Sequence, residues 1–157
     1  MQNQTYELEA LFPVEPVPRS DAIVVPFEGD SDRSALRAAL SGRKWSSISY
    51  VYMRANYPGP ISEAFTYLTP RGKAYFLPTF LRICEDHPKK ADDLPEVLLG
   101  FLVRKSSAKG SARDQTLLLL NGQQRMYFLR FLEARFKDLP GYADQLSTVR
   151  DVLQPSD

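Results

Sequence analysis

Apolar residues recur every three or four positions over most of this chain, which is the spacing of one face of an α-helix. Glycine, proline and short polar runs separate these segments and end each one after a few turns. The pattern therefore predicts six or seven short helices, within residues 31–41, 45–57, 62–68, 70–85, 93–103, 121–136 and 142–153.

Three places in the chain carry signals for the start of a helix. Thr69 followed by Pro70 offers a hydroxyl N-cap and a proline at the first helical position, where its missing N–H costs no hydrogen bond. Asn121 and Gln124 have the spacing of a capping box. Ser62 is a good N-cap for the segment that follows it. We expect helices to begin at these residues.

Pro78 lies in the middle of an aromatic and apolar run. A proline inside a helix removes one backbone hydrogen bond and disfavours helical geometry at the residue before it. We therefore expect this central helix to be broken into two, 70–76 and 78–85, with apolar side chains turned into the core. Arg71 and Lys73 are expected to stay exposed.

The N-terminal residues and one short run depart from the helical spacing. Residues 1–19 contain three prolines and little periodicity, which predicts an extended N-terminal arm. Residues 22–25, AIVV, form a β-like run that is too short to make a sheet. The predicted fold is all-α, with the arm followed by a single compact helical domain over 20–157.

Composition fits this picture and narrows the function. The chain has 157 residues, 43% of them apolar and 25% charged, which is typical of one globular domain. Its formal net charge of +1 gives no strong field that would attract nucleic acid or an anionic membrane. With no signal-like N-terminus and no apolar run of about 20 residues, we expect a cytoplasmic protein that does not enter the membrane.

The residues that usually carry catalysis or bind metals are too few to form a site. Cys84 and His87 are three apart, but a zinc site needs three or four protein ligands, and no other cysteine or histidine exists. No serine has a nucleophile-elbow motif, and no glycine-rich phosphate loop is present. The acidic pairs lie in polar surroundings typical of solvated loops. The sequence predicts no catalytic residue, cofactor or metal, and hence no enzyme.

The segment 104–113 is the most distinctive polar stretch, because it carries four positive charges and no negative one. It could grip a phosphate or an acidic partner, or it could be a solvated connection between helices. Both interpretations stay open. The candidate partner-binding residues are Arg104, Lys105, Lys109, Arg113, Arg71 and Lys73.

Three segments, LSGRKWSSI, SEAFTYLTPRGKAYFLPTFL and LLLLNGQQRMYFLRFLEARF, resemble a family of small bacterial proteins classed as a domain of unknown function. Its pattern joins a GR-W segment, an L-T-P … Y-F-L-P core and a later Q-R … F-L helix. The chain departs from it at 71–73, where the family has an acidic residue and an aromatic, and at Asn121, where it has Thr or Ser. The resemblance implies no catalysis, and such small proteins occur among toxin-immunity loci.

These observations lead to one leading hypothesis and one alternative. The leading hypothesis is a non-enzymatic cytoplasmic binding protein, an immunity protein that neutralises a bacterial toxin by direct binding. The alternative is a protein that binds nucleic acid or a phosphate ligand through 104–113. A third hypothesis is an enzyme whose acid–base pair is formed by carboxylates that lie far apart in the sequence. The sequence makes no prediction of oligomeric state.

Overall fold

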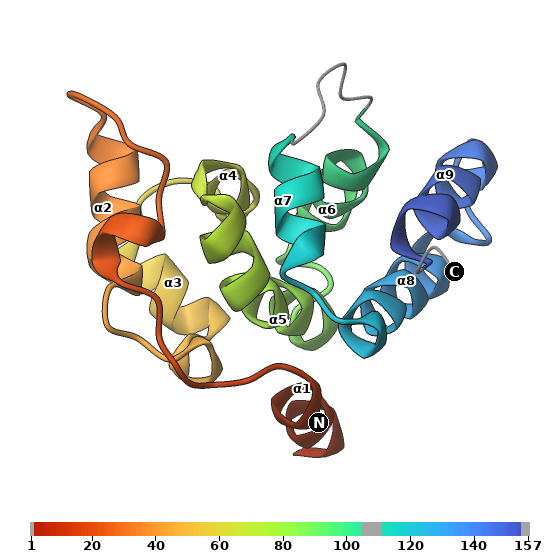
Figure 1. The fold of residues 1–157 in the computed structure, drawn as a ribbon, viewed down its shortest axis with the longest axis horizontal. Coiled ribbons are helices and arrows are strands. Elements are labelled where there is room, and N and C mark those ends of the chain that lie inside the picture. The colour runs from red at the N-terminus through yellow and green to blue at the C-terminus, as the bar shows by residue number, and fades with distance from the viewer. Residues whose placement is uncertain (1, 105–110, 155–157) are drawn as a thin grey trace. The chain divides into compact units, whose positions relative to one another are not determined.

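A computed structural model of the chain describes residues 2–104 and 111–154. These residues form an all-α fold without any strand, which confirms the predicted class (Figure 1). None of the described helices is both long enough and apolar enough to cross a bilayer. The α-helices are α1 (Gln2–Leu11), α2 (Ser31–Leu40), α3 (Tyr50–Asn56), α4 (Ile61–Tyr67), α5 (Pro70–Asp86), α6 (Leu94–Val103), α7 (Ala112–Leu118), α8 (Gly122–Phe136) and α9 (Ala143–Leu153).

The described residues thus contain nine α-helices rather than the six or seven expected, together with two short 3-10 helices, η1 (Ser20–Ala22) and η2 (Trp45–Ser47). The chain divides into two compact units, Met1–Leu94 and Pro95–Asp157. The first unit contains α1 to α5 and the second α7 to α9, and the division falls inside the first turn of α6. That residues 20–157 fold as one domain stays a prediction.

The prediction of an extended arm over 1–19 is wrong for its first half, because Gln2–Leu11 form α1. The structure gives the physical reason. Leu8 and Phe12 are one helical turn apart, and both are fully buried, so this segment has an inward apolar face before its first proline, Pro13. The three prolines follow the helix and do not interrupt it.

A buried tryptophan organises the core of the first unit. The Trp45 side chain is fully buried in η2, and its indole N–H donates to the carbonyl of Pro13 at 3.2 Å. Thr79 of α5 donates its hydroxyl to the Trp45 carbonyl at 2.9 Å. Arg82, one turn further on, donates to the carbonyls of Ser46 and Ile48. Side chains of α5 therefore satisfy the backbone of this 3-10 turn and hold it in place.

The central helix is not broken, so the prediction of two helices, 70–76 and 78–85, is wrong. One helix, α5, runs from Pro70 to Asp86 through Pro78. Losing a helical hydrogen bond to an interior proline costs about 3 kcal/mol. Burying one large apolar side chain stabilises by about 1.5–3 kcal/mol. This helix buries six apolar side chains in all, two before the proline and four after it, and their burial outweighs that cost. They are Phe76, Leu77, Phe80, Leu81, Ile83 and Cys84.

The start of α5 is as predicted, with Thr69 as N-cap accepting from the Gly72 N–H and with Pro70 at the first position. The β-like run 22–25 lies against this junction and forms one isolated antiparallel bridge, Val24 to Leu68. The Thr69 N–H donates to the Ile23 carbonyl at 2.9 Å. A Cβ on Gly72 would lie 2.3 Å from that same carbonyl oxygen. Only glycine lets the two segments approach this closely.

In α3, the apolar spacing does not identify the buried face. Val51 is 70% exposed, whereas Met53 is fully buried. The helix starts only at Tyr50, after the N-cap Ser49, so Ile48 precedes it and cannot share a helical face with later residues.

The second unit contains the clearest confirmations of the sequence pattern. Asn121 and Gln124 form the predicted capping box at the start of α8. Glu133 of α8 and Arg150 of α9 form an ion pair at 2.6 Å, which joins the two helices and was not predicted from the sequence. The apolar side chains that recur at helical spacing in both helices are buried: Phe128, Leu129, Leu132, Phe136, Leu146, Val149 and Leu153.

Candidate functional site

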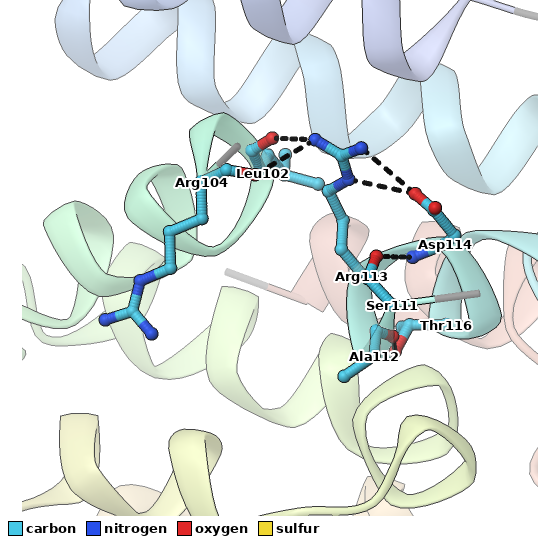
Figure 2. Close-up of polar contacts among 7 residues, drawn as sticks. All are labelled: Leu102, Arg104, Ser111, Ala112, Arg113, Asp114 and Thr116. Carbon is cyan, nitrogen blue, oxygen red and sulfur yellow. Dashed lines mark hydrogen bonds and ion pairs between the residues drawn. The ribbon is translucent and has the colours of Figure 1, made fainter. Parts of the chain in front are cut away.

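Arg113, a candidate anchor from the sequence, lies inside α7 and not in a loop (Figure 2). Its Nη1 donates to the carbonyls of Leu102 and Arg104, each at 3.2 Å. Its Nε and Nη2 donate to one carboxylate oxygen of Asp114 at 3.1 and 3.0 Å. The guanidinium therefore caps the last carbonyls of α6 and ties them to the start of α7, so its donors are used within the fold.

The other residues of 104–113 contribute less than the sequence suggested. Arg104 is exposed, and its side chain extends away from the Arg113 contacts (Figure 2). Lys105 and Lys109 lie outside the described residues. Among the described cations of this segment, Arg104 therefore presents its charge to solvent, whereas the Arg113 guanidinium forms hydrogen bonds within the fold.

The expectation that Lys73 is exposed is wrong, since its side chain is 6% exposed. Its ammonium donates to the carbonyls of Leu68 at 2.5 Å and Thr66 at 3.3 Å, and lies 5.4 Å from the centre of the Phe65 ring. These are carbonyls at the C-terminal end of α4, so the lysine caps that helix from the next one. Arg71 is exposed, as predicted.

Cys84 and His87 do not come together as ligands. Cys84 is fully buried, and the His87 ring packs against the Tyr50 ring with 4.9 Å between centroids. Over the described ranges, 2–104 and 111–154, no group of three or more histidine, cysteine or acidic side chains could hold a metal ion.

The structure contains a cleft in the first unit that the sequence did not predict. Its volume of about 310 Å³ is at the lower end of ligand-binding pockets. The two ends of α3, the Pro58–Pro60 turn, the first turn of α4 and the loop after α5 line it. We call it the Arg54 cleft, and its lining residues are Tyr50, Arg54, Pro58, Gly59, Pro60, Ile61, Ser62, Lys90, Ala91 and Asp92.

The Arg54 cleft has two cationic side chains on its walls. Arg54 makes one long hydrogen bond of 3.4 Å to the Gly59 carbonyl, and the Lys90 ammonium lies 5.5 Å from the centre of the Tyr50 ring. Neither forms an ion pair with any carboxylate of the described residues. Asp92 is the single acidic residue of the lining, and it too is unpaired among the described residues. The walls therefore carry a net positive charge.

One wall of the cleft is fixed by a tight contact beneath it. Tyr57 is 1% exposed, and a Cβ on Gly59 would lie 2.5 Å from its hydroxyl oxygen. Pro58 and Pro60 on either side restrict the backbone φ of the turn. Ser62, predicted as an N-cap, lies in the first turn of α4 after the actual cap, Pro60, and is buried. Residues at this turn therefore have little freedom.

The Tyr57 hydroxyl has no hydrogen-bond partner among the described residues, although it is buried. Burial raises the pKa of Tyr57 above its usual value, and the neighbouring Tyr67 and the carboxylates of Glu63, Asp32 and Asp30 raise it further. Tyr57 therefore stays protonated, and its side chain packs beneath the turn.

Sequence reasoning missed this cleft because its cations come from segments far apart in the chain. Arg54 lies in the last turn of α3, whereas Lys90 lies in the loop after α5. Chemically, a cleft lined by a guanidinium and an ammonium can attract an anionic group. No protein-family model matches the chain, and the comparisons with curated proteins and with solved structures give no match either.

Proposed function

We propose that this protein acts in the cytoplasm by binding another protein without catalysing a reaction, as an immunity protein that neutralises its cognate toxin. The observation that supports this proposal is the Arg54 cleft, a recess with one fixed wall and two cations that have no acidic partner among the described residues. A recess of this kind suits a side chain presented by another protein. The resemblance to small proteins of toxin-immunity loci supports a toxin as that partner.

The placement of the reactive groups favours binding over catalysis. Cys84, the one thiol of the chain, is fully buried in α5, and a buried structural cysteine is unreactive. The cleft supplies cations, a carboxylate and the buried Ser62, which can orient and neutralise a bound group. Arg113 and Lys73 are both used as helix caps. These arrangements suit a stable surface for recognition.

The alternative, binding of nucleic acid or phosphate through 104–113, has less support than binding of a protein. It relied on four cations acting together, and Arg113 donates instead to Leu102, Arg104 and Asp114. The near-neutral net charge also favours a toxin other than a nuclease, because inhibitors of nucleases are commonly acidic to match a basic active site.

Co-expression with the products of the neighbouring genes tests the proposal. We expect one of them to co-purify with the tagged chain and its toxicity to be relieved. As a matched pair, the charge-reversal variant Arg54→Glu should weaken co-purification, whereas Lys89→Glu, an exposed lysine outside the cleft lining, should not. If no neighbour forms a complex and none is neutralised, the proposed function is wrong.

A further inference from the structure

We propose that the Arg54 cleft binds a carboxylate side chain within an acidic segment of the partner protein. This inference rests on the proposed function and names the chemistry that the cleft recognises. It assigns separate roles to its charged residues: Arg54 and Lys90 hold the carboxylate, and Asp92 selects among anions.

The positions of the two cations support a carboxylate ligand. The guanidinium of Arg54 makes a single long hydrogen bond to a backbone carbonyl, which leaves most of its N–H donors available. A guanidinium presents paired donors that match the two oxygens of a carboxylate. Lys90 adds a second charge, with its ammonium 5.5 Å from the Tyr50 ring centre. Both cations line the same cleft, so an anionic group that enters it is attracted by both charges.

Asp92 favours a peptide over a phosphate. It lies on the cleft wall with a left-handed backbone φ of 52°, directly after the buried Ala91. The Asp92 carboxylate repels any anion, but it repels the double charge of a phosphate dianion more strongly than the single charge of one carboxylate. A peptide offers backbone N–H donors beside its acidic side chain, and Asp92 can accept from one of them. Two cations and one carboxylate thus complement an acidic segment of polypeptide.

The fixed wall makes this recognition efficient. The turn 58–60 is held between two prolines, and Gly59 is buried against the Tyr57 ring. A site that is already in its binding conformation loses little conformational entropy when a ligand enters. Binding of a carboxylate to Arg54 therefore does not have to offset a loss of conformational entropy in the turn.

Fluorescence anisotropy with the full chain and a labelled, acetylated hexaglutamate peptide tests the assignment at physiological ionic strength. We expect Arg54→Gln and Lys90→Gln each to weaken binding about tenfold, the effect of losing one hydrogen-bonded charge. Lys89→Gln removes a neighbouring exposed charge that does not line the cleft, and should change binding by less than about twofold. Inorganic phosphate should compete poorly, and Asp92→Asn should improve its competition.

Several results would overturn this assignment. They are the absence of peptide binding, an equal loss in Lys89→Gln and Lys90→Gln, or competition by phosphate as strong as that by the peptide. Circular dichroism and amide NMR shifts at Gly59 and Ser62 verify that the variants are folded and that the peptide enters the cleft. A partner protein that still binds Arg54→Gln and Lys90→Gln leaves the proposed function standing and refutes the cleft. If the peptide binds but no partner protein is found, the cleft assignment stands and the proposed function is refuted.

Discussion

At the scale of single residues, several polar side chains have one consistent use, which is to satisfy backbone groups. Lys73 caps the end of α4, Arg82 holds η2, and Arg113 caps α6. Each of these cations is at least partly buried, and a buried cation is stable only when its donors are satisfied. A long basic side chain in this protein is therefore not by itself a sign of a binding surface.

Replacing Lys73 tests this use directly. We expect Lys73→Met to lower the free energy of unfolding by about 1–3 kcal/mol, because it leaves carbonyls at the end of α4 without their donor. The matched control Arg71→Met, two residues away and exposed, should change it by less than about 0.5 kcal/mol. Urea denaturation measures both, and equal effects would contradict the capping role.

The Tyr57 hydroxyl has no hydrogen-bond partner among the described residues, so we expect its removal to stabilise the fold. Tyr57→Phe should raise the free energy of unfolding by up to about 1 kcal/mol at neutral pH, because a buried hydroxyl without a partner costs desolvation. Tyr75→Phe should lower it by about 1 kcal/mol, since the Tyr75 hydroxyl donates to the Val14 carbonyl at 2.7 Å. Urea denaturation measures both changes. A lower free energy of unfolding for Tyr57→Phe would mean that the hydroxyl has a hydrogen-bond partner.

The same tyrosine predicts a dependence on pH. Its pKa is raised by burial, so the folded chain keeps the proton at a pH where the unfolded chain, with a pKa of about 10, releases it. The unfolded state then binds fewer protons, and stability falls as pH rises above about 10. In Tyr57→Phe this fall should be smaller, which unfolding measured between pH 9 and 11 can show. An unchanged slope would contradict the prediction.

At the scale of elements, local signals were sufficient where a helix depends on its own residues. The capping box of Asn121 and Gln124 and the Thr69–Pro70 start were predicted because each is complete within four residues of sequence. The continuous α5 was not predicted, because burial of its neighbours, a tertiary effect, outweighs the local effect of Pro78.

The same reasoning explains what could be predicted of the candidate site. Arg71 was correctly placed at the surface, but Lys73 was not, because only the folded chain brings the end of α4 to its ammonium. Arg54 and Lys90 meet at one cleft only through packing, and no periodicity links them. Sites built from separate loops leave no signature in a single sequence.

A prediction at this scale concerns the junction of α6 and α7. Arg113→Met should lower the free energy of unfolding by about 1–3 kcal/mol, because it removes the donors to the last carbonyls of α6 and to Asp114. The control Arg104→Met removes an exposed side chain and keeps its backbone carbonyl, so it should be nearly neutral. Chemical denaturation followed by circular dichroism compares the two, and similar losses would refute the cap.

At the scale of the whole molecule, the question is whether the two compact units unfold together. The division between them falls within the first turn of α6, whereas independent domains are usually joined by an exposed linker. Leu94 and Pro95, on either side of the division, are both buried. A continuous helix across a boundary favours cooperative unfolding.

We therefore expect one unfolding transition. Trp45 is the only tryptophan and is buried in the first unit, so its fluorescence reports that unit, whereas circular dichroism reports helices of both. The two denaturation curves should coincide, as they do in a two-state protein. A fluorescence transition separated from the loss of helix would show that the units unfold independently.

The burial of Cys84 has a consequence for the chemistry of the chain in oxidising conditions. As the single cysteine, fully buried within α5, it is shielded from oxidants and from the thiol of a second copy while the first unit stays closed. Disulfide-linked dimers should therefore form only from opened molecules. The rate at which a thiol reagent modifies this sulfur in native buffer then measures how often that core opens, with no added probe.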